Sequence, residues 1–255
     1  MLKEIVISFQ SYFQAHLFIQ KNKLWKWILI PGIIYSIFFV ISIYYFGQSA
    51  TNVIEWLSLK TGLKNWVQHL QSGVIGFLFV LGGSMLWLIL MLFYFSLFKY
   101  LWLIIGSPIF AYLSEKTQSI IDETDYPFST SQFIKDIKRG IQVALRNTLW
   151  QTVYTISILL ISLIPLFGWI TPLIALLVEC YYYGFSMLDY SMERNKQSMQ
   201  DSISFIGHHK GLAIGNGIVF YAMHFIPIIG WVLAPAYSVI ASTLSLHTIN
   251  KSKSL

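Results

Sequence analysis

Two long runs of uncharged residues constrain this chain more than any other feature of its sequence. Trp27 to Phe46 is a run of 20 residues without a charge, and Gly73 to Phe98 is a run of 26. A helix needs about 20 apolar residues to cross the roughly 30 Å hydrocarbon core of a bilayer. Only helices or closed barrels satisfy their backbone in lipid, and neither run shows the polar alternation of barrel strands. We therefore predict an all-α integral membrane protein.

The composition agrees with this class and gives no support to catalysis. Charged residues make up 11% of the chain, whereas soluble domains carry about 25%. The sequence contains no G-x-S-x-G, H-E-x-x-H or P-loop motif, and its histidines lack metal-ligand spacing. The single cysteine, Cys180, allows no intramolecular disulfide. We expect no enzyme, cofactor, metal or nucleic-acid partner.

The basic residues predict the orientation in the membrane. Fourteen of the 17 Lys and Arg residues fall in segments that share one side if every pair of spans returns to its starting face. Only Lys60 and Lys64 fall on the other side, and Lys99 lies near the end of the second run. Because basic residues accumulate in cytoplasmic segments, both termini are expected to be cytoplasmic.

The residue pattern divides this single membrane domain, residues 1–255, into segments. Residues 1–24 form an amphipathic helix on the membrane surface, and residues 25–46 form the first span. The second span covers 73–105 and is expected to stop at Gly106-Ser107-Pro108. A further amphipathic helix covers 129–148, beginning at a capping-box sequence near Ser129.

An internal repeat predicts two helical hairpins. The segment Pro165 to Pro172 recurs 62 positions later as Pro227 to Pro235, and each copy interrupts an apolar stretch. Proline removes a helical donor and glycine allows the backbone to reverse, so the hairpins cover 149–188 and 211–247. Their tips are predicted at Pro165 and Gly168, and at Pro227 and Gly230. Neither tip is charged, which favours hairpins that partly penetrate the bilayer, while Trp169 and Trp231 would suit full crossing to a far interface.

Two polar residues in these hairpins are candidates for lining a pore. Glu179 stands alone among apolar residues, and a charge at membrane depth is a functional hypothesis by default. The alternative is that it faces a polar seam between helices. Asn216 lies between Gly215 and Gly217, where exposed backbone amides attract an anion or where small residues simply allow close helix packing.

Several short motifs together carry a resemblance to a known family. They include Gly106 to Ser114, Ile164 to Gly168, Leu188-Asp189-Tyr190, His209-Lys210, Ile226-Pro227 and Ala234-Pro235-Ala236. The sequence resembles the CysZ sulfate permease and etoposide-induced protein family over most of its length. The resemblance implies two long spans, two membrane-dipping hairpins and a homo-oligomer in the bacterial inner membrane. It also implies passive uptake of sulfate, or a similar oxyanion, that feeds cysteine synthesis.

The resemblance places an anion site just before the first span, where the family has Gly-Leu-Arg-Arg. This chain reads Lys23-Leu24-Trp25-Lys26 there, so Lys26 keeps a charge and Lys23 adds one. Lysine lacks the planar fork with which arginine grips an oxyanion. The lysines are therefore candidate anion ligands or charges that only orient the span. The alternative function is a non-transporting protein that organises the membrane or an envelope complex, using its amphipathic helices.

Overall fold

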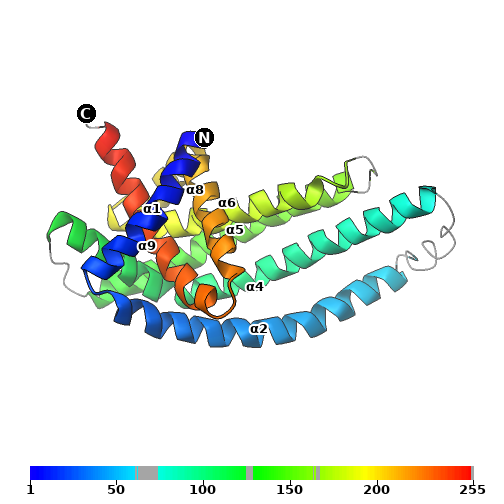
Figure 1. The fold of residues 1–255 in the computed structure, drawn as a ribbon, viewed down its shortest axis with the longest axis horizontal. Coiled ribbons are helices and arrows are strands. Elements are labelled where there is room, and N and C mark those ends of the chain that lie inside the picture. Colours follow the sequence, from blue (N-terminus) through cyan, green and yellow to red (C-terminus); the bar gives the residue numbers. More distant parts are fainter. Residues whose placement is uncertain (61, 63–73, 125–128, 163, 165–166, 254–255) are drawn as a thin grey trace. The chain divides into compact units, whose positions relative to one another are not determined.

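A computed structural model describes residues 1–60, 62, 74–124, 129–162, 164 and 167–253, and the regular elements among these residues are all α-helices. The predicted all-α class is confirmed. The helices, shown in Figure 1, are α1 (Leu2–Lys21), α2 (Trp25–Lys60), α4 (Val74–Asp122), α5 (Thr130–Ser162), α6 (Thr171–Arg194), α7 (Met199–His208), α8 (Lys210–His224) and α9 (Ile229–Lys253).

Three segments of the described chain are long and apolar enough to cross a bilayer. They are Trp25–Ser49, Thr171–Glu193 and Ile229–Lys251. The first contains the predicted span 25–46. The predicted span 73–105 falls within α4 from Val74 onward, while Gly73 lies outside the described residues.

The expectation that Gly106-Ser107-Pro108 ends a helix is wrong, because α4 continues through Pro108 to Asp122. A proline in a helix leaves the carbonyl four residues earlier without its usual amide donor, and here that carbonyl belongs to Ile104. The Ser107 hydroxyl donates to this oxygen at 2.9 Å. A serine side chain thus satisfies the acceptor that the proline leaves free, which is how membrane helices tolerate proline.

The chain forms two compact units that each take pieces of several helices. Unit 1 contains Met1–Phe39, Tyr100–Asn147 and Glu179–Leu255, and unit 2 contains Val40–Lys99 and Thr148–Val178. The candidate anion ligands and the pore-lining candidates all belong to unit 1.

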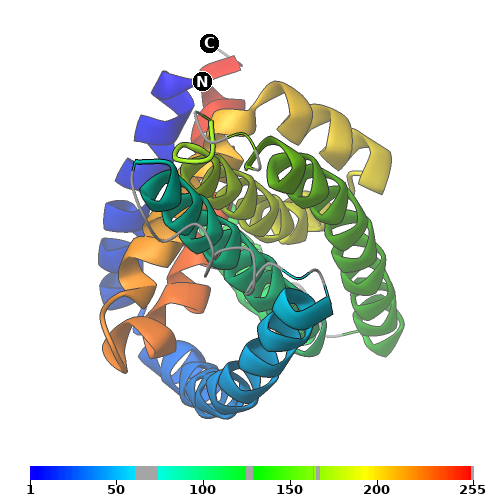
Figure 2. The same ribbon diagram turned by 90° about the vertical axis from the view of Figure 1, so that its right-hand side faces the viewer.

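In unit 1, α1 packs along α8 and α9, as Figures 1 and 2 both show. The buried face of α1 carries mostly small or polar side chains, namely Ser8, Ser11, Tyr12, Ala15 and Ile19. Its apolar stripe stays exposed and consists of Leu2, Val6, Phe9, Phe13 and Leu17. Ser8 donates to the carbonyl of Leu212 on α8 at 3.0 Å, which satisfies its hydroxyl inside the unit. The exposed stripe suits a helix that lies against lipid.

Unit 2 has a small apolar interior. Ile89, Ile158 and Ala175 are buried together, and they come from α4, α5 and α6. Elsewhere in this unit, Lys99 Nζ donates to Gln151 Oε1 at 3.4 Å. The exposed positions of α5, α6 and the turn before α6 in this unit are mostly large and apolar, including Leu149, Val153, Leu160, Phe167, Trp169 and Leu173. Such a surface is the one expected of helices solvated by lipid.

Candidate anion site and buried polar groups

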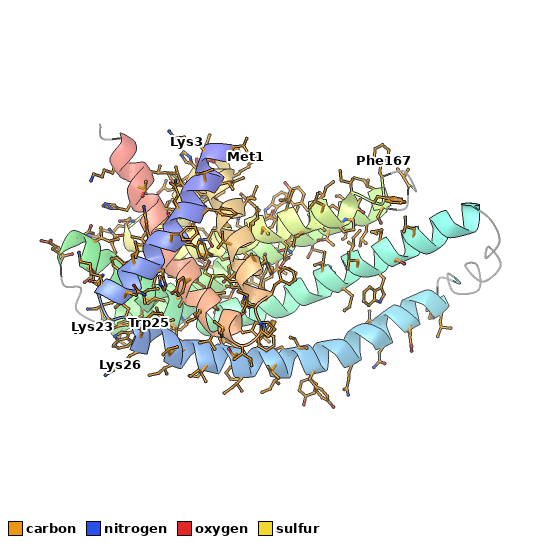
Figure 3. The ribbon with its side chains drawn as sticks, viewed as in Figure 1. Met1, Lys3, Lys23, Trp25, Lys26 and Phe167 are labelled. Atoms are coloured by element: carbon orange, nitrogen blue, oxygen red, sulfur yellow. The ribbon has the colours of Figure 1, made fainter. Side chains whose placement is uncertain are left out.

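The candidate lysines lie in a tight connection between α1 and α2. After α1 ends, the side-chain amide of Asn22 donates to the carbonyl of Phe18 at 2.9 Å. Lys23 follows with a φ of 52°, and Leu24 returns into the interior with only 3% of its surface exposed. The chain then enters α2 at Trp25. Figure 3 shows Lys23, Trp25 and Lys26 gathered at this junction.

The conformation of Lys23 explains the glycine of the family pattern at this position. A positive φ is the left-handed region, which glycine adopts without cost and a lysine adopts at roughly 1 kcal/mol. Lys23 makes this tight turn although glycine would suit it better, and it places a second cation at the start of α2.

Both lysines are exposed and available to an anion. Neither Lys23 nor Lys26 forms an ion pair with any residue in the described ranges. The first turn of α2 lies beside them, and the free amides and dipole of a helix N-terminus favour negative charge. The junction therefore combines two free ammonium groups with the start of a 36-residue helix.

Glu179 is buried between helices of unit 1. Its side chain is on α6 and is 2% exposed, and the hydroxyl of Tyr221 on α8 donates to Glu179 Oε1 at 2.6 Å. A short bond from a phenol offsets part of the cost of enclosing a carboxylate. The carboxylate links α6 to α8 in this conformation.

Asn216 is fully engaged inside unit 1. Its side-chain nitrogen donates to the Ser238 carbonyl at 3.0 Å and to Ser242 Oγ at 2.8 Å. Its side-chain oxygen accepts from the Ser238 hydroxyl at 2.5 Å. Tyr12 donates to its backbone carbonyl at 3.0 Å, so this residue connects α8 to both α9 and α1. These bonds use the amide for helix packing in this conformation.

The residues predicted at the hairpin tips fall at or beside the helix connections. Pro165 lies outside the described residues, and Gly168 lies in the turn before α6, where its carbonyl accepts from Thr171 Oγ1 at 2.6 Å. Pro227 lies in the turn between α8 and α9, and Gly230 is the second residue of α9. A side chain at Gly230 would meet the carbonyl of Met223, so this glycine permits close approach of the two helices.

A buried ion pair that the sequence did not reveal ties α5 to α6. Arg139 binds both carboxylate oxygens of Asp189, at 2.7 and 3.1 Å, and its remaining donors reach Ser202 Oγ and the carbonyl of Gln197. Burial by itself lowers the pKa of Arg139, but the hydrogen bond and charge of Asp189, with Glu193 and Asp136, give a net raised pKa. The guanidinium therefore stays charged. Arg139 and Asp189 lie 50 positions apart, and no local sequence pattern pairs them.

Comparison with known proteins gives a consistent result. A family model described as sulfate transporter CysZ/etoposide-induced protein 2.4 matches residues 12–235. A protein of Pseudomonas fluorescens strain Pf-5 named sulfate transporter CysZ is 29% identical over 135 residues, which are 52% of this chain and 54% of that protein. One of the same name from strain SBW25 is 25% identical over 135 residues, covering 52% and 53%. The matched part spans about half the length of these curated relatives.

Proposed function

The chain belongs to the sulfate transporter CysZ/etoposide-induced protein 2.4 family, and from this premise we propose that it is a passive permease or channel for sulfate or a similar oxyanion. The observation that carries the proposal is the family match over residues 12–235, which includes the lysine junction, α6 and α8. The family is one of transporters, and the matched curated relatives bear the name sulfate transporter. The uptake would serve cysteine synthesis in the bacterium whose inner membrane holds the protein.

The lysine junction would be the entry point for the anion. Lys26 and Lys23 provide two charges that have no ion-pair partner within the described residues, and they lie beside the N-terminus of α2. The two charges and the helix N-terminus all attract a divalent oxyanion. Lysine binds as a point charge, whereas paired arginines would grip two oxygens of the anion at once. We therefore expect this chain to attract sulfate but to discriminate less strongly by anion shape than relatives with the Arg-Arg pattern.

The route through the bilayer would be built by the interrupted helix pairs. We propose that α5–α6 and α8–α9 form hairpins that partly penetrate the membrane, that several copies assemble around the route, and that both termini face the cytoplasm. Three described segments suited to a bilayer and the one-sided distribution of basic residues support this arrangement.

Glu179 and Asn216 remain the proposed pore-lining residues, on the condition that the helices around them separate when the channel opens. Each is 2% exposed and hydrogen-bonded to neighbouring helices, so neither borders an open route in this conformation. Opening would require α8 to move away from α6 or α9. The described state is then the closed state of the proposed channel.

The test is uptake of labelled sulfate into proteoliposomes that hold the purified protein. Lys26→Ala should reduce the initial rate about fivefold, the loss expected for one charge contact of about 1 kcal/mol. Lys3→Ala is the matched control, because Lys3 is also exposed but lies at the opposite end of α1, as Figure 3 shows. Uptake equal to that of protein-free vesicles, or equal loss in both variants, would remove the proposal.

A second function is favoured by one specific observation. The exposed stripe of Leu2, Val6, Phe9, Phe13 and Leu17 makes α1 suited to bind a membrane surface, which a membrane-organising or envelope scaffold protein would need. A deletion strain separates the two functions. Normal growth on limiting sulfate with envelope defects would favour the scaffold, and poor growth on limiting sulfate with an intact envelope would favour the permease.

A further inference from the structure

An apolar groove runs between α2, α4 and α9 of unit 1, and it is distinct from the buried polar groups described above. It encloses about 540 Å³, part of which is open to the surroundings. No charged residue of the described chain lines it. Its walls include Pro31, Gly32, Ile34, Gly106, Ile109 and Ala236.

The length and chemistry of the groove match one leaflet of a bilayer. Its wall on α2 runs from Trp27 to Phe38, which are 11 residues apart and so about 16 Å apart along a helix. Half of the roughly 30 Å hydrocarbon core is about the same length. The predicted first span, 25–46, places this part of α2 in the leaflet that the chain enters first.

One end of the groove has the aromatic residues typical of a membrane interface. The rings of Trp27 on α2 and Tyr112 on α4 lie 4.8 Å apart between centroids, and both side chains are more than one-third exposed. Tryptophan and tyrosine accumulate at the level of lipid headgroups. The pair therefore marks the end of the groove where a headgroup would lie.

Two unpaired lysines extend beyond this aromatic pair. Lys23 precedes Trp27 by four residues, and Lys116 follows Tyr112 by four, on the helix face that carries Ile105 and Ile109. Because α2 and α4 run in opposite directions (Figure 1), the chain positions of Lys23, just before α2, and of Lys116 on α4 both come beyond the aromatic pair rather than along the groove. Neither forms an ion pair with a residue in the described part of the chain. Lys26, in contrast, projects from the side of α2 opposite the groove-lining residues.

We propose that this groove binds one anionic phospholipid, with an acyl chain between α2, α4 and α9 and the phosphate between Lys23 and Lys116. The uncharged walls suit a hydrocarbon chain, and the two ammonium groups complement a negative headgroup at the depth where lipids place it. A zwitterionic lipid would fill the same walls but would gain less from the lysines. The site shares Lys23 with the proposed anion entry point, but lipid binding can be measured without sulfate.

The experiment measures lipid retention by native mass spectrometry on delipidated full-length protein in a non-ionic detergent. Dioleoyl phosphatidylglycerol and dioleoyl phosphatidylcholine are titrated separately, without sulfate. We expect one phosphatidylglycerol per chain to bind more tightly than phosphatidylcholine, and Lys116→Ala to weaken its affinity about fivefold. Lys3→Ala, which removes an exposed lysine at the opposite end of α1 (Figure 3), should leave retention of both lipids unchanged.

A matched pair of substitutions tests the groove itself. Ile34→Trp fills the groove and should reduce retention of both lipids, while Ile30→Trp changes an exposed position on the same helix outside the groove and should not. Equal affinity for the two lipids, no effect of Lys116→Ala, or equal effects of the two tryptophans would overturn the proposal. Because no flux is measured, the lipid site and the sulfate route fail independently.

Discussion

The two units of the chain stabilise their interiors in different ways. In unit 1, hydroxyl groups from three helices meet: Ser114, Ser191 and Thr243 lie within 2.7 to 3.2 Å of one another. Unit 1 also has a larger apolar cluster, which includes Phe185 and Leu212, whereas the described apolar cluster of unit 2 is small and lies around Ile158. Since lipid is as apolar as leucine, burial of apolar groups does little to hold helices together in a bilayer. Unit 1 should therefore be the specific and rigid part, and unit 2 the more tolerant one.

The largest effect is expected from breaking the ion pair in unit 1. Asp189→Ala removes the carboxylate that binds Arg139 through two hydrogen bonds and leaves Glu193, whose Oε2 lies 3.9 Å from Arg139 Nε. Loss of one member of a buried pair costs about 3–5 kcal/mol, and we expect the lower end of that range. The midpoint of thermal unfolding in detergent should fall by many degrees. The double variant Asp189→Ala with Arg139→Met should recover part of the loss. A single variant as stable as the parent would show that this pair does not hold unit 1 together.

A smaller effect is expected where a glycine permits close helix contact. A methyl group at Gly217 of unit 1 would meet the backbone of Cys180, so Gly217→Ala should cost about 1–3 kcal/mol. Gly47 on α2 in unit 2 has open space around it, and Gly47→Ala should leave stability unchanged or slightly higher. Unfolding midpoints of both variants measure the contrast. Equal destabilisation would contradict the difference between the units.

A stabilising change is expected at the lysine junction. Lys23 has a positive φ, so Lys23→Gly should raise stability by up to about 1 kcal/mol while removing one charge. Lys26 lies in the first turn of α2, where the same substitution should have no benefit or a small cost. Thermal unfolding midpoints show whether each substitution raises or lowers stability. Because Lys23→Gly keeps the turn geometry and removes the charge, its sulfate uptake reports the contribution of the charge alone. A less stable Lys23→Gly variant would show that the left-handed turn carries no strain.

The smallest effect is a pH dependence at the start of α7. The hydroxyl and amide of Ser198 both donate to Asp201, and these bonds hold the pKa of Asp201 below its usual range. A depressed pKa means that the stabilisation is present above the unfolded-state value near 3.8 and is lost as the pH falls further. Carboxyl chemical shifts followed by nuclear magnetic resonance should titrate below that value, and Ser198→Ala should move the midpoint upward. An unchanged midpoint in that variant would show that the cap does not hold Asp201.

The sequence predicted the features that depend on local pattern. The long uncharged runs, the helix start near Ser129 and the interruptions around Gly168 and Pro227 all correspond to helices or connections in the structure. The backbone amide of Gln132, in the first turn of α5, donates to Ser129 Oγ at 3.4 Å, as expected for a helix-capping serine. Such signals act within a few residues, so they can be read from the chain itself.

Features that depend on distant partners could not be predicted in this way. The Ser107 hydroxyl donates to the carbonyl that Pro108 leaves without an amide donor, but the sequence does not specify the rotamer that makes this bond. Arg139 and Asp189 pair across α5 and α6 although they lie 50 positions apart in the sequence. The hydrogen bonds of buried Asn216 go to serines of α9, which are also distant in sequence. The exposed apolar face of α1 was predictable, but the serines that pack its other face were not identified as interior groups.

The most direct test of the proposed function is the final level of sulfate in proteoliposomes, measured without any ion gradient and with labelled sulfate outside. A passive route predicts that the label enters faster than into protein-free vesicles and stops when the inner and outer concentrations are equal. Entry no faster than into protein-free vesicles would contradict transport, and accumulation above the outer concentration would contradict a passive route.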